Sequence, residues 1–211
     1  MDFLHPEVAA HLQYVTQHDN PLLKEMEERA RNEQFPIIGP VAGVFCYQIA
    51  RLVRARHVFE LGSGFGYSTV WFARAVADNG GGRVYHTVWD ERLSKDARNY
   101  LTRAGLVHIV NFQVTESLAA LQRHNSQFDL IFCDIDKTQY PEALPIIKSR
   151  IRPGGAVIFD NMLWRGRIFD PDNRDEATQG IRRTTDMLLA DPDFTTSLIP
   201  IRDGLVLAVR N

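Results

Sequence analysis

The sequence predicts an α/β protein in which a mostly parallel central sheet is covered by helices on both faces. From His57 onward, short apolar runs alternate with amphipathic segments, which is the pattern of repeated strand–helix units. Strands of such a sheet read as continuous apolar runs because helices bury both of their faces. The predicted strands are residues 57–61, 83–88, 108–114, 129–134 and 156–160, and the predicted helices are residues 67–78, 91–105, 116–124 and 139–150.

The C-terminal part departs from this repeat. A helical segment at 174–190 is followed by two apolar runs, 194–201 and 205–211. Asp203-Gly204 lies between these runs and is a turn signal. We therefore expect an antiparallel pair of strands at one edge of the sheet.

The N-terminal part reads as helices over residues 5–34 and again over 41–54. Asn20 has the properties of a helix cap, and Pro21 suits the first helical position. We expect a single domain over residues 1–211, with a helical N-terminal extension at 1–35 and a core at 36–211.

Composition excludes several classes of function. The 211 residues carry a net charge of −2, so no overall field attracts nucleic acid or an anionic membrane. We find no signal peptide, and the longest apolar stretch, residues 36–50, is too short and too interrupted by proline and glycine to span a bilayer. Cys46 and Cys133 lie in apolar runs and are expected to be buried free thiols. These features predict a cytoplasmic protein.

A glycine-rich turn, VFELGSGFGYS, follows the first predicted strand and opens a helix. Gly62, Gly64 and Gly66 alternate in it, and a turn without Cβ atoms lets the backbone approach a ligand closely. Ser68, just inside the helix, is placed to supply a hydroxyl group. The alternative is a tight turn that needs glycine for its geometry alone, but three glycines beside a strand-end acid are more than a turn requires.

The same turn does not match the nicotinamide fingerprint G-x-G-x-x-G, because Tyr67 stands where the third glycine belongs. Glu60, near the end of the strand, would repel a diphosphate but would pair well with an ammonium or sulfonium group. A nicotinamide-dependent oxidoreductase is therefore the weaker interpretation.

Two later apolar runs end in aspartate. Asp134 ends one run, Asp160 ends the other, and Asn161 follows directly. The C-terminal ends of parallel strands share one edge of a sheet, where ligands bind, so these three side chains are expected to converge. Two carboxylates and an amide oxygen suit a hard divalent cation, with magnesium as the expected ion. Either aspartate alone is equally well explained as a helix cap or turn residue.

Lys137 lies three residues after Asp134. A lysine beside a divalent cation is repelled by it and gives up a proton more readily, which makes Lys137 a candidate general base. Without the neighbouring aspartates, a solvated lysine at a helix start would be the better interpretation.

Four stretches, VFELGSGFGYSTVWFA, FDLIFCDIDKTQY, DNMLWRG and LIPIRDGLVLAV, together resemble a known family. They are similar to the cation-dependent class I S-adenosylmethionine (SAM) O-methyltransferases of the caffeoyl-CoA and catechol type, from about residue 36 to residue 211. The resemblance implies a Rossmann-like SAM methyltransferase fold and a divalent metal held by Asp134, Asp160 and Asn161. It also implies Lys137 as the base, with Asp134 beside it as the second catalytic residue. The cofactor-binding residues that it implies are Ile38, Val41, Glu60, Gly62, Ser63, Gly64, Gly66, Ser68, Asp90, Glu116, Ser117 and Asp134.

One departure from the family concerns the ribose of the cofactor. The family ends its second strand with an acid that holds the ribose hydroxyls, and Val88 stands at that position. Asp90 follows two residues later and is the predicted substitute. Losing two ribose hydrogen bonds would cost about 1–3 kcal/mol of cofactor binding.

The resemblance implies methyl transfer from SAM to a phenolic hydroxyl of a catechol-like small molecule. Lys137, Asn161, Trp164 and Arg165 are the expected substrate contacts, while Arg165 and Arg167 are equally well explained as facing an acidic tail or water. A methyltransferase-fold binding protein with weak or lost turnover is the main alternative, because Val88 stands at an expected contact. The family also implies a homodimer.

Overall fold

A seven-stranded sheet forms the centre of residues 4–211, the part of the chain that the computed structural model describes. Its order is β3-β2-β1-β4-β5-β7-β6, with β1 to β5 parallel and β7 antiparallel to both β5 and β6. The strands are β1 (His57–Leu61), β2 (Arg83–Val88), β3 (Val110–Val114), β4 (Phe128–Cys133), β5 (Ile151–Phe159), β6 (Phe194–Ile199) and β7 (Leu205–Arg210). The predicted fold class is confirmed, including the antiparallel pair at one edge.

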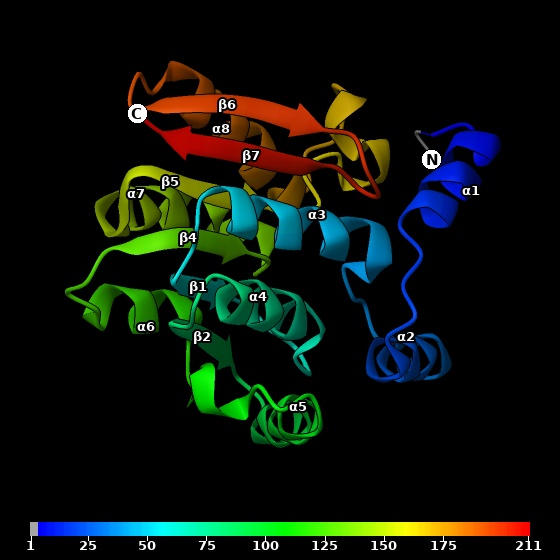
Figure 1. Ribbon diagram of the computed structural model, residues 1–211. Coiled ribbons are helices and arrows are strands. Elements are labelled where there is room, and N and C mark those ends of the chain that lie inside the picture. The colour runs from blue at the N-terminus through cyan, green and yellow to red at the C-terminus, as the bar shows by residue number, and fades with distance from the viewer. Residues whose placement is uncertain (1–3) are drawn as a thin grey trace.

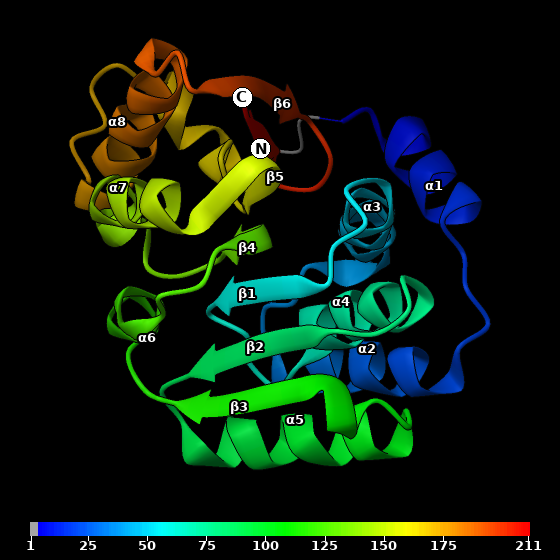
Figure 2. The same cartoon turned by 60° about the vertical axis from the view of Figure 1, so that its left-hand side comes forward.

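Helices cover both faces of this sheet, as Figure 1 and Figure 2 show. One face carries α3 (Gly39–Leu52), α4 (Tyr67–Asp78) and α5 (Glu91–Arg103), and the other carries α6 (Ser117–Arg123), α7 (Tyr140–Arg150) and α8 (Glu176–Ala190). Alternate residues of β1 supply both cores: Val58 packs toward α4, whereas Phe59 packs on the opposite side. Burial on both faces explains why these strands read as unbroken apolar runs.

The predicted bounds of β5 are wrong at its start. The sequence predicts a strand at 156–160, but β5 begins at Ile151, and its pairing with β4 shifts register between Phe128 and Leu130. Gly154 takes a φ of +70° in this irregular part. Proline and glycine at 153–155 interrupt the apolar run, so the first half of the strand carries no strand-like pattern in the sequence.

Two helices, α1 (Pro6–Val15) and α2 (Pro21–Glu33), precede the sheet, and residues 1–3 of the predicted extension lie outside the described residues. The predicted cap of α2 is confirmed, because Asn20 Oδ1 accepts hydrogen bonds from the amides of Leu22 (3.0 Å) and Leu23 (3.1 Å). The ion pair between Arg29 and Asp96, 2.7 Å long, joins α2 to α5.

Two further predictions concern the cysteines and membrane crossing. Cys46 and Cys133 are both buried and unbridged, as predicted. Among residues 4–211, no helix combines the length and the apolarity that crossing a bilayer requires.

Asp129 ties three strands together at the edge of the sheet where the parallel strands begin. Its carboxylate accepts hydrogen bonds from the amides of Arg56 (2.8 Å) and His57 (2.7 Å) at the start of β1. It also pairs with Arg152 Nε of β5 at 2.6 Å. Because the side chain is only 17% exposed, water cannot easily replace these partners.

Asp129→Ala is expected to lower the free energy of unfolding by roughly 2–4 kcal/mol, since two amides and a guanidinium lose a charged acceptor. Urea denaturation monitored by circular dichroism measures the change. Asp19→Ala is the matched control. Asp19 also forms an ion pair, with Lys24, but its side chain is fully exposed to solvent. A transition of Asp129→Ala that coincides with that of the control would contradict the role given to this carboxylate.

Candidate active site

The glycine turn lies where the sheet reverses its strand order, between β1 and β4. Gly62 takes a φ of +84°, and a Cβ added there would lie 2.3 Å from the backbone oxygen of Asp134. Only glycine allows the ends of β1 and β4 to approach this closely. Gly64 has a φ of +49°, and a Cβ added there would lie 3.1 Å from the nearest ring atom of Phe35. The glycine turn is therefore in direct contact with the backbone of Asp134, the first predicted metal ligand.

Four of the predicted cofactor residues line none of the cavities described below: Val41, Glu60, Gly66 and Asp90. A Cβ on Gly66 would lie 2.8 Å from the Cβ of Ala97, so this glycine allows α4 and α5 to pack closely. Val41, on α3, lines none of the four cavities that follow. Their predicted contacts with a cofactor stay predictions.

Glu60 is fully buried and belongs to a polar network beneath the turn. Its carboxylate accepts hydrogen bonds from Ser68 Oγ at 2.5 Å and Thr69 Oγ1 at 2.6 Å, and Thr69 Oγ1 lies 3.0 Å from His86 Nδ1. Burial raises the pKa of Glu60 to about 7, against these hydrogen bonds, which lower it. Burial also lowers the pKa of His86 to about 3, so this imidazole is neutral.

A small cavity of about 40 Å³ lies above this network. Its lining includes four of the predicted cofactor residues besides the two glycines: Ile38, Ser63, Ser68 and Asp134. Ser63 Oγ also accepts a hydrogen bond from the amide of Thr87 at 3.0 Å, which fixes the turn against β2. These side chains are thus brought together, as predicted for residues that share a ligand.

The three predicted metal ligands converge on a larger cavity of about 640 Å³, called here the central cavity. Asp134, Asp160 and Asn161 all line it, together with Gly62 and Gly64. Asp134 and Asp160 follow neighbouring strands, because β4 pairs with β5 up to Cys133 and Phe159. The strand-end argument from the sequence therefore places these groups correctly beside the glycine turn.

Lys137 also lines the central cavity and pairs with Asp134. Its Nζ lies 2.7 Å from Asp134 Oδ1 and donates to the backbone oxygen of Ile135 at 3.1 Å. The residue is 8% exposed, and its Nζ lies 5.2 Å from the centre of the Tyr140 ring. Asp136, to which the sequence assigns no role, caps the short 3₁₀ turn Lys137–Gln139 by accepting from the amide of Thr138 at 2.9 Å.

Asp160 is almost fully buried, with 1% of its surface exposed. Its Oδ1 accepts from the amide of Asn161 at 2.8 Å, and its Oδ2 pairs with Arg202 Nη1 at 3.1 Å. Burial and the nearby charge of Asp134 raise the pKa of Asp160 to about 6, while Arg202 opposes the rise. Both oxygens of this carboxylate therefore have partners within the protein.

Arg202 and Asp203 are site residues that the sequence analysis missed. They lie in the turn between β6 and β7, and Asp203 accepts from the amide of Arg165 at 2.5 Å and from Asn161 Nδ2 at 3.3 Å. The predicted antiparallel pair of C-terminal strands could have indicated that Arg202 and Asp203 lie at the site. A strand antiparallel to β5 must begin beside the end of β5, so the turn before it lies at the ligand-binding edge.

The residues present suit a hard divalent cation in their chemistry. Asn161 Nδ2 donates to Asp203, which leaves its amide oxygen as an acceptor, and Asp134 Oδ2 has no hydrogen-bond partner within residues 4–211. Among these residues, no three His, Cys, Asp or Glu side chains form a metal-binding group, so the candidate set is two carboxylates and one amide. In this structure Asp160 Oδ2, the oxygen that makes no backbone contact, is paired with Arg202.

The predicted substrate residues also line the central cavity. Trp164 and Arg165 do so from a loop with left-handed backbone, at φ values of 48° and 52°. Trp164 Nε1 is buried and has no hydrogen-bond partner among residues 4–211, so an acceptor on a ligand would satisfy it. Arg167 lies over the Trp164 ring, 5.6 Å from its centre.

A third cavity, of about 560 Å³, lies beyond the ends of β1 to β4 and is called here the edge cavity. Val88 and Trp89 line it at the end of β2, together with Glu116 and Ser117. Glu116 uses both carboxylate oxygens to cap α6, accepting from the amides of Leu118 at 2.8 Å and Ala119 at 2.5 Å.

Asp90, the predicted substitute for the ribose acid, is not part of the edge cavity lining. Its Oδ1 accepts from the amides of Arg92 (2.7 Å) and Leu93 (3.3 Å), so it caps α5. Its role toward a ribose stays a prediction, while Trp89, which is 72% exposed, occupies the rim of the cavity.

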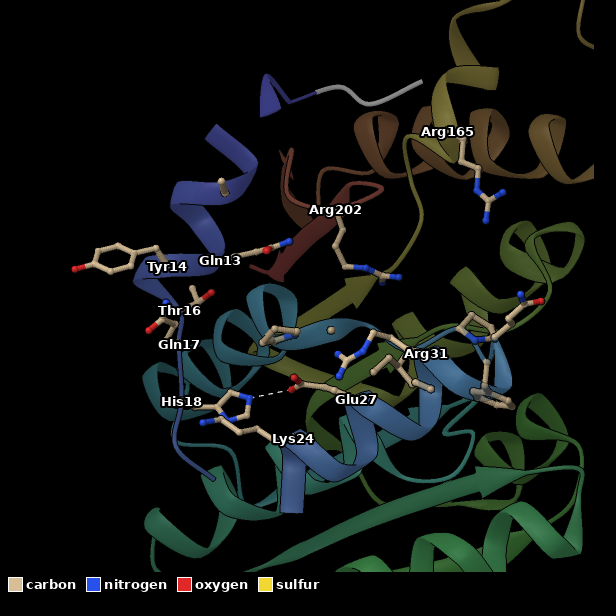
Figure 3. Close-up of a pocket in the computed structure, with 18 residues that line it drawn as sticks. Gln13, Tyr14, Thr16, Gln17, His18, Lys24, Glu27, Arg31, Arg165 and Arg202 are labelled. Carbon is tan, nitrogen blue, oxygen red and sulfur yellow. Dashed lines mark hydrogen bonds and ion pairs between the residues drawn. The ribbon is translucent and has the colours of Figure 1, made fainter. Parts of the chain in front are cut away.

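An outer cavity of about 840 Å³ separates α1 and α2 from the β6–β7 turn. Figure 3 shows Arg202 extending from the turn toward Glu27 and Arg31 of α2. Arg165 and Arg202 line both the outer and the central cavity, which therefore share a wall.

Comparisons with known proteins identify the family. The family model described as O-methyltransferase matches residues 13–211. A catechol O-methyltransferase from Niastella koreensis is 31% identical over 181 residues, which is 82% of this chain and 81% of that protein.

Solved structures agree over nearly the whole chain. The O-methyltransferase TomG from Streptomyces achromogenes, in complex with SAM, is 29% identical with a TM-score of 0.85 and covers 97% of this chain and 96% of its own. The O-methyltransferase from Bacillus cereus, in complex with S-adenosylhomocysteine (SAH), is 28% identical with a TM-score of 0.87, at 97% coverage of both chains. The glycine turn, the strand-end acids and these matches agree: the chain belongs to the O-methyltransferase family.

Proposed function

We propose that this protein transfers a methyl group from SAM to a phenolic hydroxyl of a catechol-like small molecule, with a divalent cation held by Asp134, Asp160 and Asn161. One observation carries the proposal. The glycine turn, the three oxygen ligands and Lys137 line a single cavity of about 640 Å³. A methyl donor, an acceptor oxygen and a base must all meet within bonding reach, and this cavity offers one place for them.

The SAM assignment is supported by the position of the turn and by the relatives. Gly62 and Gly64 leave the end of β1 open to a ligand, and the small cavity above Ser63 and Ser68 adjoins it. TomG and the Bacillus cereus protein, which share the fold over 97% of this chain, bind SAM and SAH.

The residues of the central cavity have different roles in the proposed reaction. SAM supplies an electrophilic methyl group when bound, and a divalent cation supplies charge that favours an ionised phenol. Lys137 Nζ, as the neutral amine, would take the phenolic proton, and Asp134, 2.7 Å away, holds that nitrogen in place. The resulting phenolate would be the group that receives the methyl carbon supplied by SAM, with SAH as the leaving group.

An aromatic acceptor fits the apolar part of the same cavity. Trp164 offers a ring and an unused N–H donor, and Phe35 and Ile135 complete an apolar wall. The acceptor's two neighbouring oxygens would face Asp134, Asp160 and Asn161.

Homodimerisation and a cytoplasmic location stay predictions. Support for a dimer comes from α1, Pro6–Val15, none of whose residues is buried. Val8, Tyr14 and Val15 of this helix are exposed apolar side chains that a second copy could cover.

Methylation of simple catechols tests the proposal. The wild-type protein is expected to bind SAM in calorimetric titrations and to methylate a catechol, with activity falling at least ~100-fold in the presence of a chelator. Asp160→Ala is expected to reproduce the chelator's effect, while the exposed Asp172→Ala retains full activity. Absence of SAM binding at millimolar concentration would refute the methyltransferase assignment, and activity indifferent to both chelator and Asp160→Ala would refute the metal.

Each carboxylate that lines the edge cavity has a hydrogen-bond partner in the protein, and position 88 carries no polar side chain. Val88 ends β2 with 7% of its surface exposed and lines the edge cavity. Around it, Glu116 caps α6, Asp136 caps the turn at 137–139 and Asp134 pairs with Lys137. A carboxylate at position 88 would therefore add an acceptor at the end of β2, where valine offers none.

Val88→Asp is expected to tighten SAH binding about 5- to 100-fold, corresponding to about 1–3 kcal/mol of added hydrogen bonding. Calorimetric titration of both proteins with SAH measures the change. Val114→Asp is the matched control, since Val114 pairs with Val88 in register on β3 but does not line the edge cavity. Unchanged or weaker binding by a folded Val88→Asp variant would show that the ribose is held elsewhere.

Glu60 makes the stability of the ligand-free protein depend on pH. Burial raises its pKa to about 7, above the ordinary value of 4.5. The folded state therefore binds this proton more tightly than the unfolded state. Its stabilising contribution is fully present below pH 4.5 and is lost as the pH rises through 7.

The substitution Glu60→Gln is expected to abolish this loss of stability with rising pH. Relative to the wild type, the variant's free energy of unfolding should rise by roughly 3 kcal/mol between pH 4.5 and pH 8. Urea denaturation across this pH range, without ligand, measures it. Glu91→Gln, with a side chain 74% exposed, serves as the control and should follow the wild type. Parallel profiles for all three proteins would contradict the buried, protonated state of Glu60.

A further inference from the structure

Each carboxylate of the candidate metal site already faces a positive charge from the protein. Lys137 Nζ lies 2.7 Å from Asp134 Oδ1, and Arg202 Nη1 lies 3.1 Å from Asp160 Oδ2. Two negative charges are thus balanced by two positive ones without any metal. Such balance matters here because Asp160 is 1% exposed and water cannot stabilise its charge.

The two cations differ in how firmly they are held. Lys137 follows Asp134 on the same loop, is 8% exposed, and is also bonded to the backbone of Ile135. Arg202 comes from the separate β6–β7 turn, and its side chain is 31% exposed. Within residues 4–211, the one hydrogen bond that its guanidinium makes goes to Asp160. Arg202 is therefore the cation that can leave.

The backbone of this turn is fixed while the Arg202 side chain is not. Leu163 donates from its amide to the backbone oxygen of Asp203 at 2.8 Å, and Met162 donates to that of Gly204 at 2.9 Å. A Cβ on Gly204 would lie 2.5 Å from Leu163 Cγ, so turn and loop are in close contact. Arg202 itself takes a φ of 51°, a conformation that favours glycine.

There is room for the Arg202 side chain away from the metal site. It lines the outer cavity of about 840 Å³ as well as the central one. On the outer side, Figure 3 shows Arg31 and Glu27 of α2. Glu27 Oε1 already accepts from Tyr67 Oη at 2.7 Å and lies 2.9 Å from His18 Nε2. Rotation about the side-chain bonds moves the guanidinium toward that side without moving the turn.

A divalent cation and the guanidinium compete for the same carboxylate. Asp160 Oδ2 pairs with Arg202 Nη1, and Oδ1 accepts from the Asn161 amide, so a cation bound to Asp160 would lie close to the guanidinium. Positive charges at one buried carboxylate repel each other strongly, so a bound metal would disfavour this position of Arg202.

We propose that Arg202 is an exchangeable internal counter-ion of the metal site, which pairs with Asp160 when no metal is bound and must be displaced for a divalent cation to bind. The proposal rests on the metal site of the proposed function. Its consequence is that Arg202 weakens metal binding and keeps the metal-free protein charge-balanced and folded.

Titration with Mn²⁺, followed by the electron paramagnetic resonance of the free ion, tests this on the whole chain. Arg202→Gly and Arg202→Met are each expected to bind Mn²⁺ at least ~10-fold more tightly than the wild type. Glycine suits the left-handed backbone, and methionine keeps side-chain length without charge. Without metal, both variants should melt at a lower temperature than the wild type, and Mn²⁺ should raise their melting temperatures more.

Arg54→Gly is the matched control, because Arg54 has the same φ of 51° at the far end of α3 and lies outside the four cavities. It separates relief of backbone strain from removal of the competing charge. Its Mn²⁺ affinity should equal that of the wild type.

Three outcomes would overturn the proposal. Equal Mn²⁺ dissociation constants in the wild type and both Arg202 variants would refute the competition and leave metal dependence standing. Tighter binding by Arg202→Gly alone would assign the effect to the backbone rather than to charge. Absence of Mn²⁺ binding in every protein would refute the metal site itself, and with it the proposed metal dependence.

Discussion

The site depends on the close approach of two strand ends, at Gly62 and Asp134. A side chain at position 62 would collide with the Asp134 backbone oxygen at 2.3 Å, and β1 and β4 would have to separate. Their contact brings the glycine turn, which follows β1, to the acid that follows β4. Asp160 then joins them because β5 pairs with β4, and the whole arrangement results from strand order and one missing Cβ.

Each acid at this edge of the sheet is stabilised by specific partners. Glu60 relies on two hydroxyl groups and remains protonated more readily than a surface acid. Asp134 and Asp160 rely on Lys137 and Arg202, whose charges come from two different loops. An acid buried without such a partner would cost several kcal/mol, so these partners are part of the fold as well as of the chemistry.

The fold and much of the site could be predicted from local sequence patterns. Apolar runs that end in Asp134 and Asp160 predicted both the strands and the meeting of their ends, because parallel strands share one edge. Arg202 could not be found in this way. Its role depends on the direction of β7 and on a side-chain contact across 42 positions of sequence, which no local pattern records.

Residues that suit two local roles were the harder cases. Asp90 and Glu116 both directly precede helices, where an acid caps free amides, and the structure places them there. The same positions lie near the strand ends where a cofactor is expected, so the sequence alone could not separate capping from binding. Gly66 presents the same ambiguity, since close helix packing and an open turn both require glycine.

The three tryptophans of the chain lie in the core, at the edge cavity and at the central cavity. Trp71 is buried at 3% exposure, Trp89 stands 72% exposed at the rim of the edge cavity, and Trp164 lines the central cavity. Indole emission shifts toward the blue when water is removed from the ring. The protein therefore carries its own optical reporters: occupancy of the edge cavity would be read at Trp89, stacking of an aromatic acceptor as quenching at Trp164, and unfolding at Trp71.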